Sequence, residues 1–133
     1  MADFRLFLPD DGGIIGSVDQ NGGLSFVVAA GEGCPIRGTE MFDLMMRAFG
    51  SRVRAISGVW RKGFEGRPST NFDKVNELTR AGMPLEAAVK QAWTATRAAR
   101  WNFTKVSVLA STEGSPGNYA KIDVLIERAE GLP

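Results

Sequence analysis

Two apolar runs flank the segment Asp19-Gln20-Asn21-Gly22-Gly23, and this spacing constrains the fold of the first thirty residues more than any other feature. Asparagine and glycine both tolerate positive φ, so an Asn-Gly pair between apolar runs predicts a β-hairpin. A second turn-rich segment, Pro9-Asp10-Asp11-Gly12-Gly13, precedes the first of these runs. Three short strands are therefore expected, at residues 4–8, 14–18 and 24–30.

Helical spacing of apolar residues follows in three places, with strand-like runs between and after them. Side chains that recur every three or four positions predict helices at 39–49, 69–81 and 84–99. Short apolar or alternating runs predict strands at 53–60, 103–109 and 119–127. The expected order is β-β-β-α-β-α-α-β-β. This is an α+β fold with N-terminal antiparallel hairpins, three helices and a small mixed or antiparallel sheet.

Length and composition indicate one globular domain. A chain of 133 residues has the commonest size of a domain, and 44% hydrophobic content is enough to bury one core. We expect a hairpin unit at 1–30 to pack on an α/β body at 39–128. No run of about 18 uncharged apolar residues occurs, which predicts that no helix spans a membrane. The polar turn at 9–13 argues against a signal peptide, and a cytoplasmic location is expected.

The absence of histidine excludes several classes of chemistry. Ser-His-Asp and Cys-His mechanisms need an imidazole base, and HExxH and Cys/His zinc sites need its nitrogen as a ligand. The single cysteine, Cys34, cannot form an intrachain disulfide, which is typical of a reducing compartment. Without a histidine to activate its thiol, Cys34 is a poor candidate nucleophile. We predict no metal site and no cofactor.

Positive charge is concentrated in the middle of the chain. The whole sequence has a net charge of +1, yet residues 47–105 contain twelve basic and four acidic residues, a local charge of +8. The segments before and after are acidic, at −5 and −2. A basic centre between acidic ends indicates either an anionic partner or complementary packing within the fold.

The expected helix at 84–99 combines basic residues with tryptophan at a spacing of three or four. The residues in question are Lys90, Trp93, Arg97 and Arg100. Such a face can hold phosphates and stack bases, so we predict that it binds nucleic acid or a nucleotide. The alternative is a solvated face on which Trp93 seals the edge of the core and the arginines lie over it.

A loop between an expected strand and an expected helix is the second candidate binding element. It contains glycines, aromatic residues and cations, among them Trp60, Arg61, Lys62 and Arg67. Backbone N–H groups at the start of the following helix would add donors for an anion. The glycine spacing and the missing Lys-Ser/Thr ending exclude a P-loop.

A catalytic set without histidine has to use other side chains. Our candidates are Thr94, Arg97, Tyr119 and Glu86. Arginine would stabilise developing charge, while a carboxylate or the tyrosine would move the proton. Asn76 and Thr94 are polar residues on otherwise apolar helix faces, where buried amides usually satisfy backbone groups.

The stretch from Met41 to Arg128 resembles a known group of domains. It contains MFDLMMRAFGSRVRAISGVW, NFDKVNELTRAGMPLEAAVKQAWTATRAARWNFTKVSV and EGSPGNYAKIDVLIE, the last with the phrase PG-x-Y-x-K-x-x-V. These lines are similar to domains at the C-terminal tips of bacterial polymorphic toxins of the Rhs type. The resemblance implies a delivered effector that attacks nucleic acids or nucleotides in the cytoplasm of a target cell, countered by a cognate immunity protein. It implies no particular catalytic residue.

Two functional hypotheses follow. The first is an effector-type domain that acts on RNA or a nucleotide-containing substrate through its basic and aromatic centre. The alternative is a non-catalytic module that binds protein or nucleic acid, with dimerisation through the helix that carries Met41, Met45 and Met46. An enzyme is expected to gather the basic residues around a concave pocket, whereas a binding module spreads them over a flat or convex face.

Overall fold

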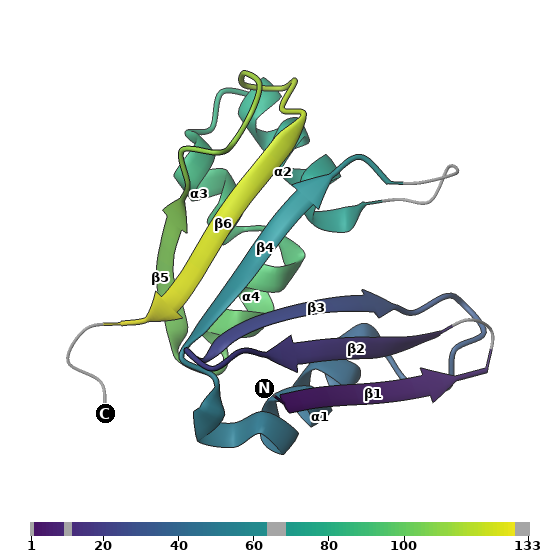
Figure 1. The fold of residues 1–133 in the computed structure, drawn as a ribbon. Coiled ribbons are helices and arrows are strands. Elements are labelled where there is room, and N and C mark those ends of the chain that lie inside the picture. Colours follow the sequence, from purple (N-terminus) through teal and green to yellow (C-terminus); the bar gives the residue numbers. More distant parts are fainter. Residues whose placement is uncertain (1, 10–11, 64–68, 130–133) are drawn as a thin grey trace. The chain divides into compact units, whose positions relative to one another are not determined.

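The computed structural model describes residues 2–9, 12–63 and 69–129. Across these residues the chain has the predicted α+β architecture, with strands and helices in broadly the expected order (Figure 1). The strands are β1 (Ala2–Leu8), β2 (Gly12–Val18), β3 (Gly23–Ala29), β4 (Ala55–Arg61), β5 (Phe103–Val108) and β6 (Lys121–Arg128). The helices are α1 (Gly38–Phe49), the 3-10 turn η1 (Gly50–Arg52), α2 (Thr70–Arg80), α3 (Leu85–Lys90) and α4 (Trp93–Ala99).

The strands form a mixed sheet in the hydrogen-bonded order β1-β2-β3-β4-β6-β5. Pairing is antiparallel between β1 and β2, between β2 and β3, and between β5 and β6, whereas β3 and β4 run parallel. The chain divides into two compact units, Met1–Ile56 and Ser57–Pro133. This division differs from the expected body at 39–128, because α1 packs against β1, β2 and β3 and so belongs to the first unit.

The first unit consists of a three-stranded meander that packs against α1. The Asn-Gly hairpin is confirmed: Val18 pairs with Leu24, and Gly22 adopts a φ of +84°. Alternation along the strands directs Ile14, Val18 and Leu24 into the core. Gly16 lets the helix approach, because a β-carbon there would lie 2.5 Å from the sulfur of Met45. The rings of Phe26 and Phe42 pack at a centroid distance of 5.4 Å.

The second unit places α2, α3 and α4 on one side of β5 and β6 (Figure 1). The inner face of β6 is the alternating set Ile122, Val124 and Ile126, all fully buried. Both α3 and α4 pack against β5, and their small residues Ala88, Ala95 and Ala98 are buried, as is Ala92 between the two helices. Alanine allows close approach of helix and sheet because it leaves no bulky side chain between them.

The single helix expected at 84–99 is instead two helices. Gln91 and Ala92 donate their N–H groups to the carbonyls of Ala88 and Val89, so α3 closes in a tight three-residue turn. Ala92 then has extended backbone angles, φ −70° and ψ 158°, which stop the helix before α4 begins. Lys90 therefore does not share one continuous helix face with Trp93 and Arg97, as had been expected.

In the part of the chain that the structure describes, no helix is both long enough and apolar enough to cross a membrane.

Candidate functional site

The guanidinium of Arg97 lies over the ring of Trp93 in α4. Its carbon is 4.8 Å from the ring centroid, a cation–π distance, and its Nη1 donates a hydrogen bond to Thr96 Oγ1 at 2.8 Å. Both side chains are half-buried. The pairing arises because residues four apart lie on the same face of a helix. Of the predicted helix face, this pair survives the break between α3 and α4.

Further cations lie where α4 leads into β5. Arg100, Trp101 and Asn102 close the end of the helix with successive N–H bonds to carbonyls three residues back, and Phe103 then enters the core. On the neighbouring strand, Arg128 pairs with Phe103 in register, and its guanidinium lies 4.9 Å from the Phe103 ring centroid. The chain turn thus brings arginines from α4 and β6 to the same end of the second unit.

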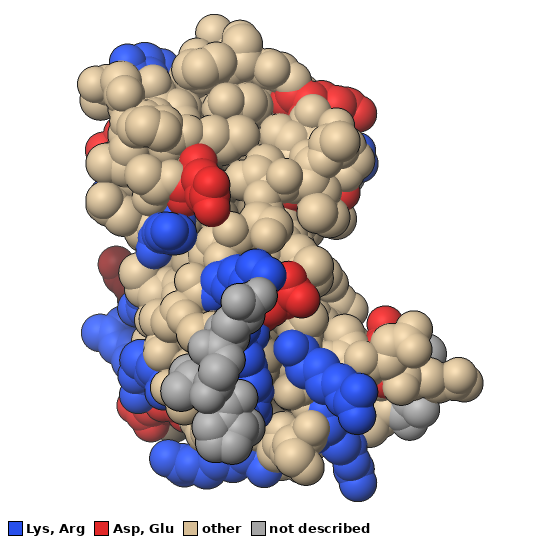
Figure 2. Space-filling model, turned by 90° about the vertical axis from the view of Figure 1, so that its left-hand side faces the viewer, with Lys and Arg blue, Asp and Glu red and all other residues tan. Residues whose placement is uncertain are grey.

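We call this region the α4–β5 surface. It comprises Trp93, Arg97, Arg100, Trp101 and Arg128. Arg100 is exposed and the other four are half-buried. Lys105 pairs with Glu127 next to the inward-facing pair Val106 and Ile126, so these two charged side chains lie on the face of the sheet away from the helices. On the face drawn in Figure 2, several Lys and Arg side chains lie in the lower half of the view.

Thr94, a catalytic candidate, has a structural role. The Nδ2 of Asn71 donates to Thr94 Oγ1 at 2.8 Å, and the Thr94 N–H donates to Asn71 Oδ1 at 2.9 Å. The N-cap residue of α4 is Ala92, which has no side-chain acceptor, so Asn71 of α2 supplies one from outside the helix. Thr94 is buried and engaged in this reciprocal pair.

Side-chain hydrogen bonds to its backbone groups fix the position of Tyr119. Its N–H donates to Asn76 Oδ1 at 2.7 Å, and Asn76 Nδ2 donates to its carbonyl at 3.2 Å. Nearby, the Gly117 N–H donates to Thr79 Oγ1 at 2.9 Å, and Arg80 donates to the Gly117 carbonyl at 2.7 Å. Asn76 thus satisfies backbone groups, as expected for a buried amide.

The catalytic candidates lie on separate elements with separate partners. Glu86 is an exposed residue in the first turn of α3, Tyr119 precedes β6, and Thr94 is committed to Asn71. This distribution leaves Arg97 as the candidate that belongs to the α4–β5 surface.

The loop predicted to bind an anion is only partly described. Trp60 is 8% exposed, so most of its ring is covered and little of it is accessible to a ligand. Arg61 and Lys62 are exposed, and Arg67 lies outside the described residues. Lys90 is exposed at the end of α3, before the break that precedes Trp93.

A hollow in the first unit was not foreseen from the sequence. It has a volume of about 610 Å³ and lies beside the β2–β3 turn. Its lining includes Asp19, Asn21, Ser51, Arg52 and Arg54. The Asp19 carboxylate accepts the N–H groups of Asn21 and Gly23, at 2.8 and 2.9 Å, and so stabilises the turn. The sequence signal for this hollow was the pair Arg52 and Arg54, but no local pattern indicated that the turn at 19–23 would lie beside them.

Two further predictions concern metal binding and the methionine-bearing helix. Among the described residues, no group of three or more Cys, Asp or Glu side chains is placed to hold a metal ion. Met41, Met45 and Met46 are all buried within the first unit, and dimerisation through this helix stays a prediction. The methionines pack against the meander.

Comparison with protein-family models, curated proteins and solved structures finds no match for this chain. The functional argument therefore rests on the chain's own residues.

Proposed function

We propose that this chain is an effector-type domain that binds RNA or a nucleotide-containing molecule through the α4–β5 surface. The observation that carries the proposal is the Arg97 guanidinium stacked 4.8 Å from the Trp93 ring centroid. A planar guanidinium held against a ring keeps its N–H groups at the edge of the pair, where they can donate to two phosphate oxygens. The contact between the two side chains is made without a ligand, which reduces the entropy lost on binding.

The surrounding residues supply what a single strand of nucleic acid requires. Arg100 and Arg128 add positive charge for the phosphates, and the half-buried Trp101 offers an aromatic ring for a base. Stacking tolerates every base, so we expect little sequence preference. The resemblance to polymorphic-toxin tips implies the same class of target, and with it a cognate immunity protein.

Binding without chemistry is the alternative, and one observation favours it. Thr94 is hydrogen-bonded to Asn71, while Tyr119 and Glu86 lie on other elements. A general acid or base has to reach the same substrate atom as the arginines, usually within hydrogen-bond distance. A binding module needs no such convergence, so the dispersed positions of the catalytic candidates favour binding without catalysis.

The direct test is fluorescence anisotropy with a labelled single-stranded RNA of mixed sequence, titrated with the whole chain at several salt concentrations. Arg97→Ala should weaken binding by roughly tenfold, because both a phosphate donor and its stacked geometry are lost. Arg97→Lys keeps the charge but not the planar stack, so it should also bind more weakly than the wild type. Lys74→Ala, an exposed charge on α2, is the matched control and should bind within about twofold of the wild type.

If Arg97→Ala and Lys74→Ala lost RNA affinity equally, net charge alone would explain the loss, and the assigned surface would be refuted. No RNA binding by the wild type at low salt would refute the proposal itself.

Chemistry is tested separately by inducing the intact chain in a bacterial host and following growth, total RNA, DNA and NAD. Arrest with loss of one pool, abolished by Arg97→Ala, would support an effector enzyme and identify its target. Normal growth with all three pools intact, together with RNA binding in vitro, would support the binding module instead.

A further inference from the structure

Strand β1 forms an end of the described sheet and has no proline, glycine or register shift that would interrupt its edge. The described strand order places β1 beside β2 and no other strand. Its seven residues, Ala2–Leu8, contain neither proline nor glycine, and their register with β2 is continuous from Ala2↔Val18 to Leu8↔Gly12. An unbroken edge strand is a ready template for a further strand.

The strand at the other end of the described sheet, β5, carries features that discourage the addition of a further strand. The register of β5 shifts between Phe103 and Lys105, which marks a bulge or irregularity, and Lys105 is exposed at that point. Bulges and edge lysines both discourage strand addition. The contrast between β5 and β1 indicates that the regular edge of β1 is available for pairing.

The hydrogen-bond pattern determines which backbone groups of β1 face outward. The Asp19 N–H donates to the Gly23 carbonyl at 3.0 Å, so odd-numbered residues of β2 face β3 and even-numbered residues face β1. Their β1 partners are even-numbered too, as in Phe4↔Gly16 and Leu6↔Ile14. The outward backbone groups therefore belong to the odd-numbered residues, which are Asp3, Arg5 and Phe7, and all three are exposed.

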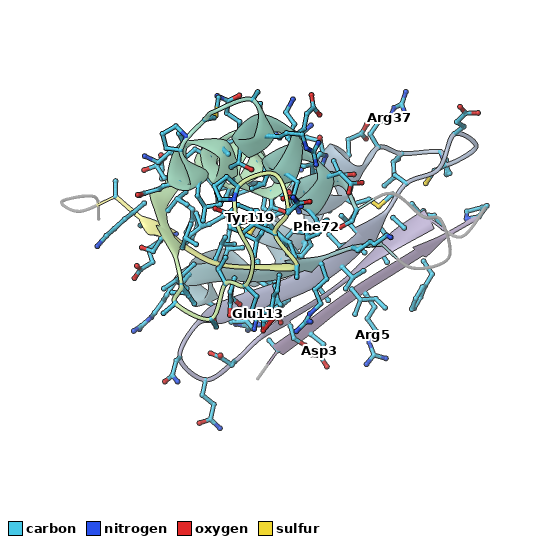
Figure 3. The ribbon with its side chains drawn as sticks, turned by 90° about the horizontal axis from the view of Figure 1, so that it is seen from above. Asp3, Arg5, Arg37, Phe72, Glu113 and Tyr119 are labelled. Carbon is cyan, nitrogen blue, oxygen red and sulfur yellow. The ribbon has the colours of Figure 1, made fainter. Side chains whose placement is uncertain are left out.

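Asp3 and Arg5 are two residues apart, so they project from the same face of β1 (Figure 3). The Asp3 carboxylate is held there, because Ser17 Oγ donates to its Oδ1 at 2.5 Å. An opposite charge on each side of Phe4 gives the edge a self-complementary pattern. A second copy that pairs antiparallel about Phe4 would place its Arg5 opposite Asp3 and its Asp3 opposite Arg5.

We propose that β1 pairs antiparallel with β1 of a second copy of this chain, on a two-fold axis that passes beside Phe4. Both members of each Asp3–Arg5 pair have outward backbone groups, so the pairs are of the hydrogen-bonded type. The two Phe4 side chains then meet on the opposite face. A symmetric contact of this kind closes on itself and limits assembly to a dimer.

Neighbouring registers lack this complementarity. An axis beside Arg5 would place two arginines opposite each other, and an axis beside Asp3 would oppose two carboxylates. An axis beside Leu6 would put Arg5 opposite Phe7 and leave Asp3 without a charged partner within the strand. Like charges directly opposite destabilise an antiparallel pair, whereas opposite charges stabilise it. The charge pattern therefore selects Phe4 as the centre.

Charge exchange provides the test, with sedimentation equilibrium of the whole chain over a wide range of concentration. Asp3→Arg and Arg5→Asp each create two like-charge pairs and should raise the dimer dissociation constant by on the order of tenfold. The double variant Asp3→Arg/Arg5→Asp restores opposite charges and should return close to the wild-type value. Arg37→Asp, an exposed change outside β1, is the control for net charge and should leave dimerisation unchanged.

Three outcomes would overturn the inference: a wild-type chain that is monomeric throughout, single variants that dimerise like the wild type, or a double variant no better than the single ones. Far-UV circular dichroism checks that each variant is folded. The inference does not depend on RNA binding, since β1 contributes nothing to the α4–β5 surface.

Discussion

The indole of Trp60 packs back over Gly58, two residues earlier on the same face of β4. A β-carbon at position 58 would lie 2.6 Å from the indole Nε1 and 3.2 Å from Cε2. The glycine is therefore required by the ring rather than by the backbone. Its φ lies outside the left-handed region, so any residue could adopt the same backbone conformation.

Gly58→Ala is expected to destabilise the fold by about 1–3 kcal/mol, because the buried ring has to leave its position. The free energy of unfolding in urea measures this change. In a Trp60→Leu background the indole is absent, and the same alanine should cost much less. Additive effects of the two substitutions would contradict the proposed contact.

The link between Asn71 and Thr94 predicts a difference between two substitutions. Asn71→Ala removes the acceptor that caps the Thr94 N–H, and should lower the free energy of unfolding by about 0.5–2 kcal/mol. Asn71→Asp retains that acceptor and places a negative charge at the N-terminus of α4, so it should stay close to the wild type. Urea denaturation of the three proteins distinguishes them; equal stability of Asn71→Ala and wild type would refute the capping role.

Asn76 hydrogen-bonds both backbone groups of Tyr119, so replacing Asn76 should destabilise the segment that leads into β6. Asn76→Ala leaves a donor and an acceptor without their partner, and we expect a loss of about 1–3 kcal/mol. Lys74→Ala, an exposed position on the same helix, is the control and should change stability by less than about 0.5 kcal/mol. Amide hydrogen exchange should show faster exchange at Tyr119 in Asn76→Ala alone.

Gly117 combines a positive φ of +81° with a close neighbour, since a β-carbon there would lie 3.0 Å from the β-carbon of Arg80. Gly117→Ala should therefore destabilise the protein by about 1–3 kcal/mol. Gly31→Ala is the matched control, because a β-carbon at Gly31 meets nothing within 4 Å. Thermal unfolding of both variants checks the contrast; similar melting temperatures would contradict it.

Much of the secondary structure was predictable because its signals are local. Of the Asn21-Gly22 pair, Gly22 adopts a positive φ, and the hairpin forms where it was expected. Alternation at Ile122, Val124 and Ile126 reports one buried face of a strand whatever the strand pairs with. The α+β class follows from the order of such elements.

The break between α3 and α4 was not predictable, because its cause is remote in sequence. The alanines at 88, 92 and 95 have continuous helical spacing, yet Asn71 supplies an acceptor to Thr94 from 23 positions away. A helix can restart only where its first N–H groups find partners. The new start of a helix at Trp93 separates Lys90 from Trp93, although both were expected on one helix face.

Residue order alone was enough to predict the local elements, the absence of histidine chemistry and the basic character of the centre. Three features depend on tertiary packing: the burial of Trp60, the structural hydrogen bonds of Thr94 and Asn76, and the position of Arg97, Arg100 and Arg128 at the same end of the second unit. Periodicity and turn preference depend on a few neighbouring residues. Burial and surface charge depend on which distant segments pack together, and that choice is made by the whole core.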